Sequence, residues 1–373
     1  MTATATVPDA LVVGGGVVGA ACARALATAG LRVELLETGF VGGGATGAGM
    51  GHIVVMDDSP AQLALTRASA GLLAELADEL PGDVELVRTG TLWIAADPVE
   101  MEGARAKVDA YRSVGLAAEL LDGAALAEAE PELRPGLAGA ARVSGDAVLY
   151  PPALARWLAA APGILVREGC RVSALVADGV VLDDGSRRPA GCVVLATGAA
   201  AAHLAPGLPV MPRRGHLLVS DRYPDFCRHQ LVELGYLRSA HDMSTDSVAF
   251  NVQPRATGQL LIGSSRELVG WDAGVNRSMV ARMLTRACAY LPGLAALHML
   301  RTWMGFRPAT PDGLPLIGRW PRAAHTWVAV GHEGLGITTA LATGRLLAEL
   351  VTGEAPFLDA APYDPVRELS VSG

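Results

Sequence analysis

The stretch ALVVGGGVVGAACARALATAGLRVELLE, residues 10–37, decides the fold. An apolar run at residues 10–13 predicts a buried strand, and the alanine-rich run that follows predicts a helix over residues 20–29. Gly30 ends that helix, and residues 31–36 predict a second strand. A strand, a helix and a second strand in this order predict a βαβ unit with a parallel sheet.

Between the first strand and the helix, the run GGGVVG matches the pattern G-x-G-x-x-G through Gly14, Gly16 and Gly19. In such a unit the first glycine makes a tight turn, the second lets the backbone approach a pyrophosphate, and the third lets the helix pack on the strand. Glu37 follows the second strand, where an acid binds a ribose hydroxyl pair. The sequence therefore predicts a dinucleotide site, and the alternative is a glycine turn in another α/β domain.

Size and charge restrict the remaining possibilities. The chain has 373 residues and a formal net charge of −8. Its length predicts two domains, and its acidic balance without a basic stripe argues against nucleic-acid binding. There is no uninterrupted apolar run of membrane-spanning length, and the N-terminus lacks the basic start of a secretory signal. We therefore expect a cytoplasmic protein that does not insert into a membrane.

The five cysteines are scattered and never form a C-x-x-C pair. This pattern indicates a reducing compartment and argues against a zinc or iron–sulfur site, so no metal is expected. Lys107 is the only lysine in the sequence, so catalytic roles for lysine are almost excluded.

A second glycine-rich stretch, FVGGGATGAGMGH, covers residues 40–52. Its small residues permit a close backbone approach to a flat ring. Thr46 and His52 are its only side chains with useful polarity. His52 lies beside a bound ring in one interpretation and is bonded to the backbone of a tight loop in the other.

The middle of the chain predicts helices over residues 61–79, 99–114, 123–130 and 153–160, and a strand–turn–strand unit over residues 84–95. Short strands are expected at residues 164–166, 172–176 and 180–182, with a hairpin turn at residues 183–186. The run CVVLATG, residues 192–198, predicts a buried strand with a glycine exit. Residues 209–300 alternate in short β-rich pieces, which predicts an antiparallel sheet that forms one wall of a cleft.

The C-terminal region repeats the pattern of strand, glycine loop and helix in WVAVGHEGLGITTALATGRLLAELVTG, residues 327–353. The helix is expected over residues 337–351, and its N-terminus carries about half a positive charge. His332 lies in the loop and could add charge. A second phosphate loop and a merely structural turn are the alternatives.

These motifs, together with GFRPATPDGLPLIG at residues 305–318, resemble the D-amino-acid oxidase superfamily from end to end. The pattern is most similar to glycine oxidases, sarcosine oxidase-like enzymes and D-hydroxyproline dehydrogenase subunits. The resemblance implies an α/β FAD-binding Rossmann-like domain of the two-dinucleotide-fold kind, interleaved with a mainly antiparallel substrate-binding sheet. The implied boundaries are 1–82, 143–203 and 301–373 for the FAD-binding domain, and 83–142 and 204–300 for the substrate-binding domain.

The resemblance also implies roles for individual residues. Arg307 matches the arginine that binds the substrate carboxylate, a task suited to a planar guanidinium. The alternative is a structural arginine paired with an acid such as Asp312. The three prolines and three glycines around it exclude a helix interior or a central strand. Further candidates for the substrate pocket are His216, Tyr236, His241, Asn251 and Arg266.

Contacts to FAD are expected from the glycine motifs, the A-T-G segment and the C-terminal loop. The residues are Gly14, Gly16, Val17, Val18, Gly19, Glu37, Thr38, Gly44, Ala45, Thr46, Gly49, Met50, Gly51, His52, Val172, Thr197, Gly198, Arg307, His332, Glu333, Gly334, Leu335, Gly336, Ile337 and Thr338.

Three departures from the family pattern matter. Asn251 stands where glycine oxidases often have a tyrosine, which puts glycine itself in doubt as the best substrate. Trp303 stands where sarcosine oxidases have the cysteine that attaches FAD covalently, so we expect non-covalent FAD. Leu261 stands where they have a lysine that activates oxygen.

The resulting hypothesis is an FAD-dependent oxidase of an amino acid or an N-substituted glycine. Hydride transfer to flavin N5 would form an imine, hydrolysis would follow, and O2 would be the acceptor and yield H2O2. A dehydrogenase subunit that passes electrons to a partner or a quinone is the main alternative. A catalytically silent FAD-binding scaffold is a third hypothesis, and a nicotinamide dehydrogenase explains the fewest motifs. The chain could also form homo-oligomers.

Overall fold

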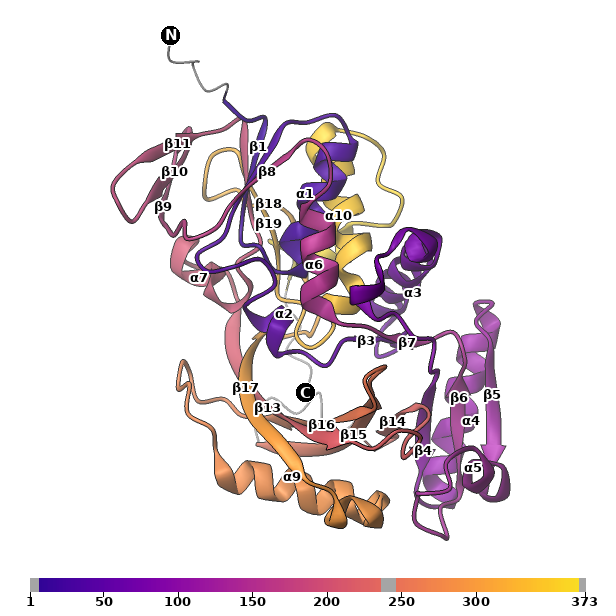
Figure 1. Ribbon diagram of the computed structural model, residues 1–373. Helices are drawn as coiled ribbons and strands as arrows, with labels where there is room; N and C mark the ends of the chain where they lie inside the picture. The colour runs from indigo at the N-terminus through magenta and orange to yellow at the C-terminus, as the bar shows by residue number, and fades with distance from the viewer. Residues whose placement is uncertain (1–6, 236–245, 369–373) are drawn as a thin grey trace.

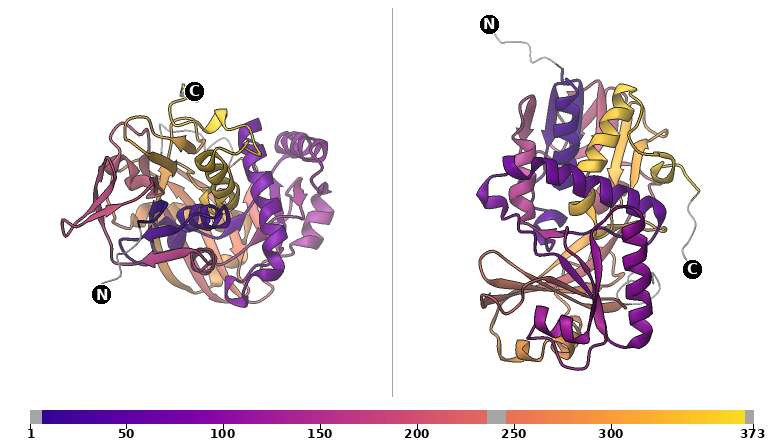
Figure 2. Two further views of the ribbon diagram at one scale, coloured as in Figure 1. Left: turned by 90° about the horizontal axis from the view of Figure 1, so that it is seen from above. Right: turned by 90° about the vertical axis from the view of Figure 1, so that its right-hand side faces the viewer.

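The structure is a computed structural model that describes residues 7–235 and 246–368. Two large sheets organise the described chain, and Figure 1 shows them one above the other. Helices cover the upper sheet, and a second set of helices lies below and beside the lower sheet (Figures 1 and 2). The α/β class and the Rossmann-like part predicted from the sequence are confirmed.

The upper sheet has six strands, and the N-terminal strand lies inside it. In order across the sheet the strands are β18 (Leu316–Arg319), β19 (Thr326–Val330), β12 (Cys192–Leu195), β1 (Ala10–Val13), β2 (Val33–Leu36) and β8 (Ile164–Arg167). All neighbours pair in parallel except β18 and β19. Because both faces of a parallel sheet are covered, its strands consist of nearly continuous apolar residues, as in ALVV and CVVL.

Helices from separate parts of the chain cover one face of this sheet. They are α1 (Val17–Thr28), α10 (Gly336–Thr352), α6 (Pro151–Ala159) and α3 (Pro60–Leu76). α1 contacts both α10 and α6, and α10 contacts α3. The small alanines of α1 let these helices approach closely, and most of the helix is buried.

A three-stranded antiparallel sheet lies beside the upper sheet. Its strands are β9 (Val172–Val176), β10 (Gly179–Leu182) and β11 (Arg187–Pro189), and α7 (Ala201–Leu204) follows β12. A two-stranded antiparallel sheet, formed by β3 (His52–Ile53) and β7 (Ala147–Val148), and the short helix α2 (Ala45–Ala48) lie between this part and the lower sheet.

The lower sheet has eight strands and is mostly antiparallel. In order they are β17 (Met299–Ala309), β13 (Met211–Arg222), β16 (Gln259–Arg266), β15 (Ser247–Pro254), β14 (Gln230–Glu233), β4 (Thr91–Ala95), β6 (Gly139–Val143) and β5 (Ala118–Asp122). Only β14 and β4 pair in parallel. The helices attached to this sheet are α9 (Arg277–Tyr290), α4 (Pro98–Ser113) and α5 (Gly123–Ala129).

Helix boundaries predicted from the sequence agree with the structure to within a few residues, because capping residues mark several starts. Ser59 and Asp97 accept hydrogen bonds from the first turns of α3 and α4, and a proline follows each of them. The predicted strand–turn–strand unit at residues 84–95 is wrong in its first half. Glu85 has a φ of 51°, which interrupts an extended chain, and only a single bridge at Val87 remains.

The proline-rich segment around residue 307 belongs to β17, at the edge of the lower sheet. The exclusion of a helix or a central strand therefore holds. Residues 301–309 pair along their length with β13, although the expected domain division assigns them to the FAD-binding part. None of the helices in the described ranges combines the length and the apolar character needed to cross a membrane.

Candidate active site

A cavity of about 990 Å3 lies where the carboxyl ends of the upper strands face the lower sheet. Its lining comes from the first glycine loop, the second glycine loop, the C-terminal loop and strands β13, β15, β16 and β17. Ligands of open α/β sheets bind at this end of the strands. Both parts of the molecule therefore contribute to one cavity.

The first glycine loop is built as its pattern predicts. Gly14 has a φ of 107°, and a side chain there would collide with the carbonyl oxygen of Ala196. At the start of α1, the N–H of Val17 donates to Oγ1 of Thr46 at 2.9 Å. Because Gly16, Val17 and Thr46 all line the cavity, the first and second glycine loops meet at one helix N-terminus.

Glu37 closes the other side of this loop. Its Oε2 accepts the N–H of Gly15 at 2.7 Å, and its Oε1 accepts the N–H of Gly39 at 2.8 Å. These two bonds hold the carboxylate at the cavity wall. Each oxygen has a second lone pair, so the carboxylate can also accept hydroxyl donors.

Most of the residues expected to contact FAD line the cavity. They are Gly14, Gly16, Val17, Val18, Glu37, Thr38, Gly44, Ala45, Thr46, Gly49, Met50, Gly51, His52, Val172, Thr197, Gly198, Arg307, His332, Glu333, Gly334, Leu335, Gly336 and Ile337. Gly19 and Thr338 do not line it. Gly19 packs against the carbonyl oxygen of Gly14, and the Thr338 hydroxyl donates to the carbonyl oxygen of His52 at 3.0 Å.

Two of the histidines that line the cavity, His52 and His332, are neutral. Burial lowers the pKa of His52 to about 3 and that of His332 to about 3. His52 Nε2 lies 2.9 Å from Oγ1 of Thr91, and His332 Nε2 lies 3.1 Å from Oγ1 of Thr343. The expectation that His332 could add positive charge is therefore wrong, because its buried ring favours the uncharged form.

Arg307 projects from β17 into the cavity. Its Nη1 donates to the carbonyl oxygen of Ser265 at 2.8 Å, and its Nε lies near the position a side chain on Gly334 would occupy. The alternative pairing with Asp312 is absent, because the Asp312 carboxylate is bound by both Nε and Nη2 of Arg367 at 2.8 Å. Arg307 is therefore directed to the cavity and not to the turn that follows it.

The other substrate candidates separate into three groups. Asn251 and Arg266 line the cavity. His216 does not: it is fully buried behind the cavity, with Nδ1 at 3.0 Å from Oγ of Ser265 and Nε2 accepting the N–H of Asn276. Its role as a substrate residue is therefore not supported by its position. Tyr236 and His241 lie outside the described residues.

The sequence interpretation did not include Arg213, which lines the cavity directly opposite Arg307 on the neighbouring strand. The alternation of β13 could have indicated it, because Arg213 and Gly215 point to one face of the sheet. Glu333 lies between these groups: its Oε1 is 3.3 Å from Nε of Arg266 and 3.8 Å from Nη1 of Arg213. Burial alone would raise the pKa of Glu333, but the charges of Arg266, Arg307 and Arg213 together hold it below its usual value.

Trp271 was also missed. It lies in the loop between β16 and α9, is 46% exposed, and lines the cavity. Its ring lies 5.0 Å from Phe306 in an edge-to-face arrangement and 5.4 Å from His203. A lone tryptophan in a polar loop gives no periodic signal, so the sequence could not place it.

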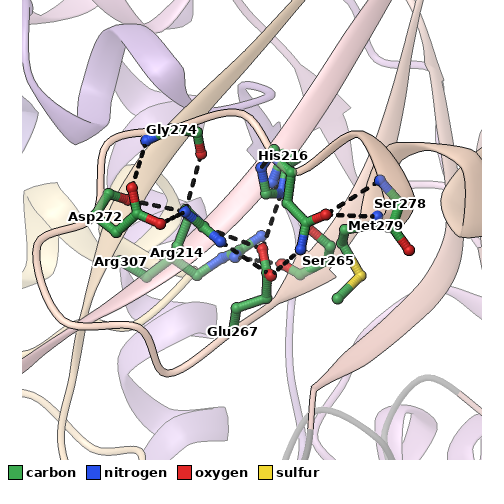
Figure 3. Close-up of polar contacts among 10 residues, drawn as sticks. Arg214, His216, Ser265, Glu267, Asp272, Gly274, Ser278, Met279 and Arg307 are labelled. Carbon is green, nitrogen blue, oxygen red and sulfur yellow. Dashed lines mark hydrogen bonds and ion pairs between the residues drawn. The ribbon is translucent and has the colours of Figure 1, made fainter.

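A second ionic network fixes that loop from behind the cavity. Arg214 binds both oxygens of Glu267 at 3.1 Å, and its Nη1 donates to Oδ2 of Asp272 at 2.7 Å and to the carbonyl oxygen of Gly274 at 2.9 Å. Figure 3 shows the guanidinium of Arg214 between Glu267 and Asp272, with Arg307 near it. Adjacent arginines on β13 therefore have different tasks: Arg213 faces the cavity and Arg214 holds the loop.

The arrangement suits a dinucleotide cofactor. The N-termini of α1 and α10 both open into the cavity, and Glu37 lies at its edge. A Cβ added at Gly44 or Gly198 would meet nothing within 4 Å. The lining therefore leaves room along the second glycine loop and in the segment after β12. Fold and site together define a dinucleotide-dependent oxidoreductase whose cavity wall presents several arginine side chains.

The comparisons with known proteins give the family. The chain belongs to the FAD dependent oxidoreductase family, whose pattern matches residues 9–350. It is 32% identical to a glycine oxidase of Geobacillus kaustophilus over 98% of each chain, and 32% identical to a glycine oxidase of Pseudomonas aeruginosa over 96% of this chain and 99% of that one. The crystal structure of the Geobacillus kaustophilus glycine oxidase superposes with a TM-score of 0.87 at 30% identity, covering 97% of this chain and 99% of that one. The protein is therefore an FAD-dependent enzyme, as the sequence predicts.

Proposed function

We propose that this enzyme oxidises the C–N bond of an amino acid or an N-substituted glycine. The products are an imine, which water hydrolyses, and H2O2 from O2 as the electron acceptor. The main support for this proposal is the position of Arg307. Its guanidinium extends from β17 into the cavity that is also lined by both glycine loops. The similarity to proteins named glycine oxidase supports the same reaction type.

Residues of the upper part would hold the cofactor. The α1 N-terminus with Thr46 would face its phosphates, and Glu37 would accept its ribose hydroxyls. FAD, when bound, supplies a two-electron acceptor for the hydride of the substrate Cα–H. We propose that it is bound non-covalently, because the indole of Trp303 donates to the carbonyl oxygen of Ala48 at 3.2 Å and offers no nucleophile.

Arg307 would bind the substrate carboxylate through two parallel N–H bonds and so fix the direction of Cα. Its bond to the carbonyl oxygen of Ser265 limits the rotation of the guanidinium before the substrate arrives. We assign no side-chain base, because an amine that binds in its neutral form needs none. Asn251 would shape the pocket beside it.

The electron acceptor has two candidates. O2 is the first, in keeping with the named oxidases. A partner protein or a quinone is the second, and one observation favours it. Position 261, where sarcosine oxidases have a lysine, is a leucine that is buried in β16 outside the cavity lining. Lys107 is buried in a pair with Asp57. Neither position therefore places an ammonium group at the cavity.

The sheet pairing supports a different boundary between the two parts. We propose that the substrate-binding part extends through residue 309, because β17 pairs with β13 along its length. We also propose a cytoplasmic location, which the five free cysteines support. A homo-oligomer remains a prediction.

Anaerobic mixing with substrate tests the proposal. Glycine, sarcosine, D-proline and longer N-carboxymethyl amino acids should each be tried, and at least one should bleach the flavin absorbance. Arg307→Ala should lower the ratio of reduction rate to Kd by about 100- to 10,000-fold, because it removes a charged two-bond contact. The variant should retain FAD.

Two outcomes would change the conclusion. If the wild type binds FAD but no amine bleaches it, the silent-scaffold hypothesis replaces this one. If amines bleach the flavin but air neither restores its colour nor yields H2O2, while a dye does restore it, the dehydrogenase alternative is correct. Arg307→Lys serves as the matched control, since it keeps one charge but not the planar pair of donors.

A further inference from the structure

Three polar side chains lead from the cavity into the region between the two large sheets. His52 of β3 lines the cavity, and its Nε2 lies 2.9 Å from Oγ1 of Thr91 on β4. The Thr91 side chain in turn forms a hydrogen bond with the carboxyl group of Asp146, the residue before β7. Thr91 and Asp146 are 0% and 2% exposed. We call these three residues the His–Thr–Asp chain.

Backbone contacts fix Asp146 at the inner end of this chain. β3 pairs with β7, and just after β3 the N–H of Val55 donates to Oδ1 of Asp146 at 3.3 Å. The N–H of Gly90, next to Thr91, donates to the carbonyl oxygen of Asp146 at 3.0 Å. The His–Thr–Asp chain is therefore held by paired strands behind the cavity wall.

Both ends of the His–Thr–Asp chain can exchange a proton. At the inner end, Oδ2 of Asp146 is buried and has no hydrogen-bond partner within the described part of the protein. Burial raises the pKa of Asp146 to about 7, and the hydrogen bonds from Thr91 and Val55 act in the opposite direction. At the cavity end, Nδ1 of His52 makes no hydrogen bond to any residue that the structure describes, so it is available to a ligand.

Two residues of α4, Lys107 and Tyr111, interact electrostatically with Asp146. Lys107 forms an ion pair with Asp57, and its charge also acts to lower the pKa of Asp146. Burial raises the pKa of Tyr111 far above its usual value, and the nearby carboxylates of Asp57, Asp146 and Asp58 add to this effect. Tyr111 therefore keeps its proton, whereas Asp146 can gain or lose one near neutral pH.

We propose that the His–Thr–Asp chain carries protons between the cavity and Asp146 during the oxidation of the amine. This inference rests on the proposed function. When a hydride leaves Cα of a neutral amine, the nitrogen becomes positively charged and must lose one proton to give the imine, while the electrons of that N–H bond stay on the nitrogen. His52 accepts this proton at Nδ1 as its Nε2–H proton passes to Thr91, and Thr91 passes its own proton to the Asp146 carboxylate.

The same proton is needed in the second half of the reaction. Formation of H2O2 from O2 consumes the hydride and one proton. Asp146 supplies that proton through Thr91 and His52, in the reverse direction. Protons and electrons then balance over one turnover, and Asp146 returns to its ionised form.

Infrared spectroscopy of the FAD-loaded enzyme tests the state of Asp146 without turnover. The carbonyl stretch of a protonated carboxylic acid should disappear as the pH rises through about 7, and Asp146→Asn should lack this band. Thr91→Val should move the midpoint to higher pH, because it removes a hydrogen bond that lowers the pKa, and Thr91→Ser should restore it. A wild type without the titrating band, or an Asp146→Asn variant that keeps it, would overturn the inference.

Reoxidation of the photoreduced enzyme by O2 tests the transfer without an amine. In the wild type the rate should fall as the pH rises through about 7, because Asp146 has then lost its proton. Thr91→Val should lower the rate at about pH 6 by about 10-fold or more and flatten the pH profile, and Thr91→Ser should restore both. Thr89→Val is the matched control: it removes a neighbouring hydroxyl that donates to the carbonyl oxygen of Gly90 at 3.2 Å, and it should keep the wild-type profile.

The outcomes separate this inference from the proposed function. If Thr91→Val reoxidises like the wild type, or if Thr91→Ser is as slow as Thr91→Val, the inference is wrong. If the variants behave as expected but no amine reduces the flavin, the proposed function fails and the proton transfer stands. If Asp146→Asn does not fold, the two Thr91 variants decide, because they leave Asp146 in place. If O2 does not reoxidise the flavin, the same comparison uses a quinone, whose reduction also takes a hydride and one proton.

Discussion

Gly215 lies directly under the guanidinium of Arg307. A Cβ at this position would come within 2.0 Å of Nη1 of Arg307 and 2.9 Å of the carbonyl oxygen of Ser265. The Gly215→Ala substitution should therefore displace the guanidinium and break its bond to Ser265. We expect Kd for a carboxylate ligand to rise by about 10- to 100-fold, since about one charged hydrogen bond is lost. FAD absorbance should be retained.

The matched control is Gly71→Ala on the surface of α3, where an added Cβ meets nothing within 4 Å. It should change neither ligand binding nor flavin content, and it should stabilise the helix slightly. A Gly215→Ala protein with unchanged Kd would show that Arg307 does not need this position for binding.

His332 gives a pH dependence of stability. Its pKa is about 3 in the folded protein, against about 6.5 for an unburied histidine. At pH values between these two, His332 is protonated in the unfolded chain but not in the native protein. The free energy of unfolding therefore falls as the pH drops below about 6.5. Between pH 6 and pH 4.5, His332→Gln should lose about 2 kcal/mol less stability than the wild type. Urea unfolding at both pH values, with FAD in fixed excess, measures the difference.

If His332→Gln instead follows the wild-type pH profile, then the His332 ring is not held neutral in the native protein.

At the residue scale, sequence patterns reveal side chains that belong to a motif. Gly14 and Glu37 fall in such patterns, and the structure places both at the cavity. Arg213 and Trp271 were missed, because nothing in the sequence says which strand lies opposite β17 or where a loop folds back. His216 was misplaced for the same reason: its alternation assigns it to a sheet, and the neighbours that bury it, Ser265 and Asn276, are distant in sequence.

At the scale of elements, the loop between β16 and α9 depends on one arginine. Arg214 forms an ion pair with Glu267, whose side chain is 2% exposed. It also donates hydrogen bonds to the Asp272 carboxylate and to the carbonyl oxygen of Gly274. Arg214→Met should lower the free energy of unfolding by about 3–5 kcal/mol, because it leaves a buried carboxylate without its main counter-charge. Denaturant unfolding measures this loss.

Adding Glu267→Gln to Arg214→Met should restore part of the stability, since the stranded charge is removed. The double variant should still bind large substrates less tightly than the wild type, because Trp271 has lost its anchored loop. A double variant that is as unstable as the single one would mean that Arg214 acts through packing and not through charge.

Element boundaries were predictable where caps or prolines mark them, as at α3 and α4. The prediction of a strand that begins at Val84 was wrong. The left-handed conformation of Glu85 depends on tertiary contacts, which the apolar pattern of the sequence does not show. The membership of β17 in the lower sheet was also hidden, because pairing between residues so distant in sequence leaves no local trace.

At the scale of the whole molecule, FAD should stabilise both sheets together, since one cavity draws its lining from each. A ligand that binds only the native state at 100 times its Kd adds about 2.7 kcal/mol to the free energy of unfolding. The Tm should therefore rise with the logarithm of FAD concentration in a single transition. ADP should reproduce only part of the rise, because it reaches only the phosphate and ribose end. Two transitions, with only one shifted by FAD, would mean that the two parts unfold independently.

The pairing of α1 with α10 sets an order of events during synthesis. α1 leaves the ribosome well before the last cavity loop and the helix that covers it have been made. At about 5–20 residues per second, α1 waits on the order of 15 to 60 seconds with its alanine-rich face uncovered. The complete cavity can therefore capture its cofactor only after α10 has been synthesised.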